Sequence, residues 1–64
     1  MVKINGNQTE ADGMKLTDYL ASAGYIEKKI AVEINEEIVP KAKYDETILK
    51  DGDKVEVVRF VGGG

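Results

Sequence analysis

The residues of this sequence that could do chemistry lie at its carboxyl end. Three consecutive glycines, Gly62, Gly63 and Gly64, follow Val61, and Gly64 carries the α-carboxylate. Glycine has no Cβ atom, so such a segment can enter a channel that is too narrow for other residues. Glycine also loses the most backbone entropy on ordering, which predicts a flexible tail over residues 61–64. A frayed terminus is the alternative interpretation of the same residues.

The residue types that are absent restrict any other chemistry. The sequence has no His and no Cys, so it offers no imidazole base, no thiolate nucleophile and no zinc site of the usual kind. Ser22 has no recognisable base near it in sequence, and the acidic pairs Glu36-Glu37 and Asp51/Asp53 fall in turn-like segments. We therefore predict no catalytic residues, no metal site and no bound cofactor, and expect a substrate or carrier of other enzymes rather than an enzyme.

The length and composition predict one small domain over residues 1–60, followed by the tail at 61–64. With 42% apolar and 33% charged residues, the chain has the composition of a soluble globular protein. The formal net charge of −3 argues against binding to nucleic acid and suits a partner with a basic surface. No apolar run has the length of a membrane span or the pattern of a signal peptide, so we expect a cytoplasmic protein.

The elements that must position the tail can be predicted from the spacing of the apolar residues. Val2 and Ile4 alternate with polar neighbours, which predicts a strand, and Asn5-Gly6-Asn7 predicts a turn into a second strand around residues 8–11. An apolar stripe at helical spacing then predicts a helix, with Leu16, Tyr19, Leu20 and Ala23 on its buried face. Gly24 is placed to end that helix in the left-handed conformation.

The second half of the chain predicts three further strands. One covers residues 30–34, a short one covers residues 38–39 before Pro40, and the last runs from residue 54 to about residue 60. Between the last two, Tyr44 and Ile48 are expected to anchor an irregular segment in the core. The predicted order is β-β-α-β-β-β, an α+β arrangement in which a mixed sheet folds over one helix.

The last predicted strand carries two apolar residues on the face that should be polar. Val55 and Val57 point to one side, whereas Val58 and Phe60 share the other side with Lys54 and Glu56. Either the strand twists enough to bury Val58 and Phe60, or a bulge changes its register, or an apolar patch lies next to the tail. Such a patch beside the tail is typical of a docking surface.

Three segments of the sequence form a recognisable combination: residues 35–40 (Asn-Glu-Glu-Ile-Val-Pro), residues 49–58 with the Asp51-Gly52-Asp53 turn, and residues 61–64. Together they resemble the ThiS family of sulfur carrier proteins of thiamine biosynthesis. The resemblance covers the whole chain and implies the ubiquitin-like β-grasp fold. It departs from the family at Lys15, where relatives often have a Thr or Ser that can cap the helix; a missing cap costs about 1 kcal/mol.

The resemblance also implies a mechanism and a set of partners. A ThiF-type adenylyltransferase, which binds ATP and its metal, would convert the Gly64 carboxylate to an acyl-adenylate. A persulfide, supplied by cysteine through a cysteine desulfurase, would displace AMP and leave a thiocarboxylate. A ThiG-type thiazole synthase would then take up the sulfur. The partners would bind the tail and the patch, which are formed by Val58, Phe60, Val61, Gly62, Gly63 and Gly64.

Two other interpretations remain at the level of sequence. The chain could be a β-grasp sulfur carrier of another pathway, such as molybdopterin synthesis, with the same tail chemistry. It could also be a β-grasp binding module whose glycine tail is incidental. The segment 35–40 and the short length favour the thiamine carrier over a carrier of another pathway. The glycine-rich end favours a carrier over a binding module.

Overall fold

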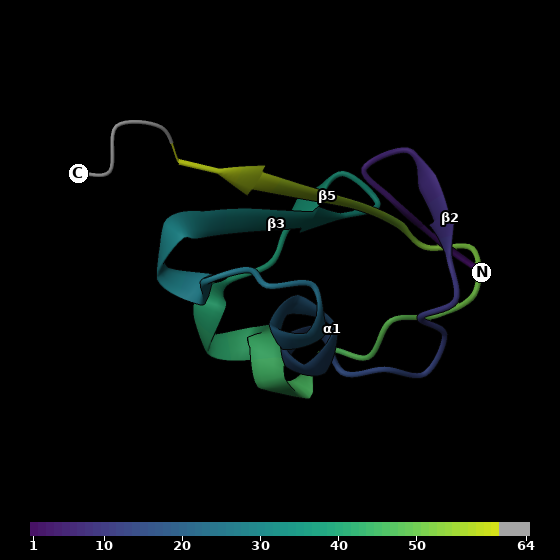
Figure 1. Ribbon diagram of the computed structural model, residues 1–64, viewed down its shortest axis with the longest axis horizontal. Helices are drawn as coiled ribbons and strands as arrows, with labels where there is room; N and C mark the ends of the chain where they lie inside the picture. Colours follow the sequence, from purple (N-terminus) through teal and green to yellow (C-terminus); the bar gives the residue numbers. More distant parts are fainter. Residues whose placement is uncertain (61–64) are drawn as a thin grey trace.

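The computed structural model describes residues 1–60, which form a five-stranded sheet with one α-helix against one of its faces (Figure 1). The strands are β1 (Val2–Ile4), β2 (Asn7–Thr9), β3 (Ile30–Ile34), β4 (Glu37–Ile38) and β5 (Lys54–Arg59). They lie in the order β2-β1-β5-β3-β4, with β1 parallel to β5 and the other neighbours antiparallel. The predicted mixed sheet is confirmed, and its central strand is the one that leads to the carboxyl end.

The helix α1 (Leu16–Ser22) ends as its sequence predicts. Gly24 has a φ of 83°, and its N–H donates to the carbonyl of Ala21 at 3.2 Å. The N–H of Tyr25 donates to the carbonyl of Leu20 at 2.9 Å, so the two bonds form a Schellman motif. The helix stops before Ala23, which is exposed; its predicted place on the buried face is therefore wrong.

The amino end of α1 lacks a side-chain cap, as Lys15 predicts. A backbone contact replaces part of what a cap would supply, because the N–H of Leu16 donates to the carbonyl of Thr47 at 2.8 Å. The helix therefore has fewer unpaired N–H groups at its amino end than the lack of a capping side chain suggests.

Two short 3₁₀ helices connect the strands, η1 (Glu27–Lys29) and η2 (Lys41–Glu46). Tyr44 of η2 is 1% exposed and is a core anchor, as predicted. Ile48 is not an anchor: it is 42% exposed, and Leu49 is buried in its place. The segment is extended here, since Ile48 forms a β-bridge with Lys15, and successive side chains of an extended chain point to opposite sides.

Two strands differ slightly in extent from their predictions. The second strand ends at Thr9, earlier than expected, and Ala11 is buried beyond it. The strand β4 begins at Glu37 because Asn35 and Glu36, with φ values of 53° and 70°, form a two-residue turn of the type that joins tight hairpins.

The hydrophobic core lies between the sheet and α1, and both layers contribute to it. Its buried members are Val2, Ile4, Ala11, Leu16, Leu20, Ile30, Val32, Tyr44, Leu49, Val55 and Val57. Two of them, Val55 and Val57, belong to β5, so burial fixes the inner face of the central strand. None of the helices in residues 1–60 has the length and apolar character needed to cross a membrane.

Candidate functional site

The predicted reactive end of the chain lies just beyond the described residues. Val61, Gly62, Gly63 and Gly64 are outside them, and the description ends at Phe60, one residue after β5. The site can therefore be built up to the point from which the tail departs. That point lies one residue after β5, the central strand of the sheet, which neighbours β1 on one side and β3 on the other (Figure 1).

Val58 and Phe60 are exposed, and we refer to these two residues as the exit patch. Each has 55% of its surface accessible to solvent. The register between β3 and β5 is continuous from Ile30 opposite Arg59 to Ile34 opposite Val55, so no bulge turns either side chain inward. Of the three possibilities that the sequence left open, the apolar patch beside the tail is the one observed.

Two asparagine side chains bind the backbone of β5. The Asn5 amide accepts a hydrogen bond from the N–H of Val57 at 2.7 Å and donates to the carbonyl of the same residue at 3.3 Å. Near the other end of β5, the Asn35 amide accepts from the N–H of Lys54 at 3.0 Å and donates to the Asp53 carboxylate at 3.1 Å. Each amide continues the pairing beyond the end of a neighbouring strand, so β5 is held along its length.

Both asparagines adopt left-handed backbone conformations, with φ values of 49° for Asn5 and 53° for Asn35. Asparagine tolerates this conformation better than most residues. The contacts also explain why two segments of the sequence motif occur together, because Asn35 of the first segment binds Asp53 of the second. The Asp53 carboxylate in turn accepts from the N–H of Lys50 at 3.0 Å, which closes the turn before β5.

The end of β5 has two further contacts. The N–H of Phe60 donates to the carbonyl of Lys29 at 2.9 Å, which extends the β3–β5 pairing by one residue. The Arg59 guanidinium lies over the ring of Tyr25, 4.6 Å from its centroid, a distance typical of a cation–π contact. The chain is thus ordered by specific contacts up to the residue before the tail.

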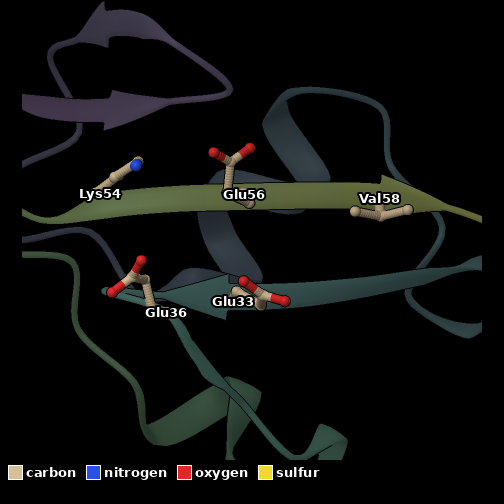
Figure 2. A pocket seen from close by; sticks show the side chains of 5 residues that line it. All are labelled: Glu33, Glu36, Lys54, Glu56 and Val58. Carbon is tan, nitrogen blue, oxygen red and sulfur yellow. The ribbon is translucent and has the colours of Figure 1, made fainter.

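A pocket of about 330 Å³ lies on the face of the sheet next to Val58 (Figure 2). It is lined by Glu33, Glu36, Lys54, Glu56 and Val58. Figure 2 shows that these side chains come from β5, from β3 and from the turn that follows β3. Three carboxylates and one ammonium line it, so the pocket beside the exit patch has a negative charge.

Within residues 1–60, no group of three or more His, Cys, Asp or Glu side chains is placed to bind a metal ion. This includes the three carboxylates that line the pocket, those of Glu33, Glu36 and Glu56. They point outward from the sheet, and their chemistry is that of a charged surface.

The sequence drew attention to Val58 and Phe60, with their exposure left open, but gave no sign of the groups that hold β5 in place. Asn5 and Asn35 carry only a local turn signal in the sequence, because their partners on β5 are distant along the chain. The alternation of β3 and β5 places Glu33 and Glu56 on polar faces. Their direct opposition follows only from the register between the strands.

The order of elements, the mixed sheet around a central β5 and the helix against one face define a ubiquitin-like β-grasp domain. In the sequence, three glycines begin two residues after the end of its central strand. The family model described as the ThiS family matches residues 2–64, and the chain belongs to that family.

Individual relatives agree with this membership. The chain is 41% identical over 66 residues to the sulfur carrier protein ThiS of Bacillus subtilis, and the match covers 100% of both chains. It is 31% identical to the thiamine biosynthesis protein ThiS of Geobacter metallireducens, whose crystal structure matches with a TM-score of 0.77 over 98% of this chain and 97% of that one.

Two further relatives are much longer proteins. The chain is 44% identical over 62 residues to a thiazole synthase of Paramagnetospirillum magneticum, a match that covers 95% of this chain and 19% of the relative. A thiazole synthase of Magnetococcus marinus is 36% identical over 64 residues, with 20% of its length covered. The chain therefore spans about a fifth of the length of these two curated relatives.

Proposed function

We propose that this protein is a sulfur carrier of thiamine biosynthesis and that the Gly64 carboxylate is the group that carries the sulfur. The observation that carries the proposal is the match of residues 2–64 to the ThiS family, which includes the glycine-rich end. A relative that matches over its full length has the name sulfur carrier protein ThiS. The exposed exit patch beside the tail gives partner enzymes a surface to bind.

The chemistry follows from the weakness of a carboxylate as an electrophile. An adenylyltransferase of the ThiF type, which binds ATP and its metal, joins the Gly64 carboxylate to the α-phosphorus and releases pyrophosphate. The sulfur of a persulfide then attacks the carbonyl carbon and displaces AMP. Reductive cleavage of the resulting acyl disulfide by a thiol leaves the thiocarboxylate. In this scheme the chain is a protein co-substrate, and its own side chains perform no catalytic step.

The domain and the tail have different tasks in this proposal. Residues 1–60 present the exit patch from a strand that is held on both sides, and residues 61–64 enter the active sites of the partners. Gly63 and Gly64 are the pair that the chemistry requires, because enzyme backbone must approach closely to the reacting carbonyl. Gly62 adds reach.

The acceptor of the sulfur is a thiazole synthase of the ThiG type. Support comes from the two longer relatives, in which a segment similar to this chain is part of a protein named thiazole synthase. A cysteine desulfurase supplies the persulfide. The proposal places the carrier in the cytoplasm together with these enzymes.

An intact-mass measurement tests the proposal. The protein is incubated with ATP, a ThiF-type enzyme, a cysteine desulfurase, cysteine and a thiol reductant. We expect its mass to increase by the difference between sulfur and oxygen. A variant without Gly64 is the control and should show no change. If the wild-type protein gains no mass with its cognate enzyme, the carrier function is wrong.

A second measurement separates the thiamine pathway from others. The gene is expressed in a strain that requires thiazole because it lacks its own ThiS, and growth is followed without thiazole. Growth supports the thiamine pathway. If the thiocarboxylate forms but growth does not occur in a host that contains the cognate partners, the protein is a carrier of another pathway.

A further inference from the structure

The ammonium group of Lys41 lies where three segments of the chain meet at the end of β5. Lys41 is the first residue of η2. Its Nζ donates to the carbonyl of Ile30 at 2.8 Å and also to the carbonyl of Glu27. One side chain of η2 therefore connects the first residue of η1 with the first residue of β3.

The same ammonium faces two aromatic rings. The Lys41 Nζ lies 5.8 Å from the ring centroid of Tyr44 and 5.7 Å from that of Phe60. Both distances are within the range in which a cation is attracted to the face of an aromatic ring. Tyr44 is 1% exposed and fixed in the core, whereas Phe60 is 55% exposed and outside any strand. The ammonium thus connects a fixed ring to an exposed one.

Phe60 has one other contact that fixes its position, the hydrogen bond from its N–H to the carbonyl of Lys29. That bond holds the backbone but leaves the ring free to rotate about its own side-chain bonds. The contact with Lys41 restrains the ring itself. Both contacts act on the last residue before the segment 61–64, so they determine where that segment leaves the domain.

We propose that Lys41 is a positioning residue for sulfur activation: its ammonium holds the Phe60 ring in the orientation that the activating enzyme binds and fixes the point from which residues 61–64 depart. This inference rests on the proposed carrier function. Lys41 touches no reacting atom and acts through Phe60. A lysine suits the task because its ammonium has three donors on a flexible stem, two of which bind carbonyls, and because its charge attracts both rings.

The test compares Lys41→Met with Lys43→Met. Methionine retains most of the apolar stem and removes the charge. Lys43 belongs to the same 3₁₀ helix, is exposed and pairs with Glu46 alone at 3.4 Å, which makes it a matched control. With the ThiF-type enzyme, we expect Lys41→Met to raise KM for the carrier about fivefold with a smaller change in kcat, the size expected when the cation–π contact that orients Phe60 is lost. Lys43→Met should leave both constants unchanged.

Two further readouts separate positioning from plain stabilisation. Hydrogen exchange at the Phe60 amide should become faster in Lys41→Met, while exchange at core amides such as Val57 stays the same. The double variant Lys41→Met/Phe60→Leu should have the same KM as Phe60→Leu alone, because the lysine acts through the ring. Lys41→Arg, which retains the charge, should restore most of the lost activation.

Each outcome supports or overturns the inference. An unchanged KM in Lys41→Met, or additive effects in the double variant, would overturn it. So would a Lys41→Met protein that no longer folds, since the ammonium would then serve stability rather than position. If the wild-type protein forms no thiocarboxylate, the carrier function itself is wrong. Independently of that result, unchanged hydrogen exchange at the Phe60 amide in Lys41→Met would show that Lys41 does not restrain Phe60.

Discussion

Glu33 on β3 and Glu56 on β5 lie directly opposite each other, and in residues 1–60 neither carboxylate has a basic side chain within 4.0 Å. Like charges in opposed positions of neighbouring antiparallel strands destabilise a sheet. Both residues line the pocket beside Val58. The two opposed carboxylates therefore lower the stability of the fold next to the surface that we propose to be bound by the activating enzyme.

Replacing one of these carboxylates should have opposite effects on stability and on activation. In Glu56→Lys the repulsion is replaced by an attractive pair with Glu33, so the free energy of unfolding is expected to rise by about 0.5–1 kcal/mol. The new positive charge should weaken binding of an enzyme with a basic surface and raise its KM several-fold. Urea unfolding and adenylation kinetics measure the two effects.

Glu10→Lys is the control for this prediction, because Glu10 is exposed, follows β2 and undergoes the same change in charge. It should leave KM unchanged at moderate salt, where distant surface charges are screened. Equal effects of the two variants on KM would show that net charge, rather than the pocket, determines binding.

Phe60→Asp should impair activation while the domain stays folded. The side chain is 55% exposed, so the free energy of unfolding should fall by less than about 1 kcal/mol, including the lost contact with Lys41. If the ring anchors the partner, KM for the carrier should rise about tenfold or more. Ile48→Asp is the control, since Ile48 is also exposed but pairs with Lys15 away from β5. Loss of folding in Phe60→Asp would mean that the ring belongs to the core.

The Asn5 amide should contribute measurably to stability. In Asn5→Gly the backbone keeps its conformation, while the two bonds to Val57 and the longer bond to the Tyr25 hydroxyl at 3.5 Å are lost, so we expect a destabilisation of about 1–3 kcal/mol. Asn5→Ala should cost about 1 kcal/mol more, because alanine tolerates the φ of 49° poorly. Asn7→Ala is the control, since within residues 1–60 the Asn7 side chain makes no hydrogen bond and its backbone carbonyl accepts from the Thr9 hydroxyl at 3.1 Å. Equal stability of Asn5→Gly and the wild-type protein would show that the hydrogen bonds of the Asn5 amide do not stabilise the domain.

The ion pair between the Met1 amino group and Asp51 should give stability a weak pH dependence. A hydrogen bond to the Asp51 carboxylate raises the pKa of the amino group above its ordinary value of 8.0, and the same bond lowers the pKa of Asp51 below 3.8. The amino group's contribution is complete below pH 8.0 and disappears as pH rises through its raised pKa. The carboxylate's contribution is present above pH 3.8 and disappears as pH falls through its lowered pKa.

An NMR titration of Asp51→Asn checks this prediction. The pKa of the amino group should fall toward its ordinary value, though not completely, because Asp12 also lies 3.3 Å from it. Asp45→Asn, an exposed change elsewhere, should leave that pKa where it is. Both partners of the pair are largely exposed, so solvent screens their contribution and the stability change should be small.

Much of the fold could be predicted because its signals are local. The alternation in residues 30–34 predicts β3, and Gly24 predicts the end of α1. The exchange of Ile48 for Leu49 as the core anchor could not be predicted, because the choice depends on the bridge between Ile48 and Lys15. The position of β5 in the centre of the sheet likewise depends on contacts between residues far apart in sequence.

The candidate site was predicted only in part, because some of its features depend on contacts between residues that are far apart in sequence. Alternation places Val58 and Phe60 on the outer side of the last strand, but only the continuous register with β3 excludes a bulge. The contact between Lys41 and Phe60 joins residues in different elements that have no shared pattern in the sequence. The prediction that Gly64 is the reactive end rests on the resemblance to the ThiS family, because periodicity alone gives no indication of it.

The Asn5 amide also makes the domain sensitive to chemical ageing. Asn5 is followed by Gly6, and an asparagine before glycine loses ammonia readily, through attack of the glycine nitrogen on the side-chain carbonyl and hydrolysis of the cyclic imide. The product at this position has a carboxylate where the amide donated to the carbonyl of Val57, so two oxygens would then face each other. Deamidation in a stored sample would therefore loosen the strand that precedes the proposed reactive end.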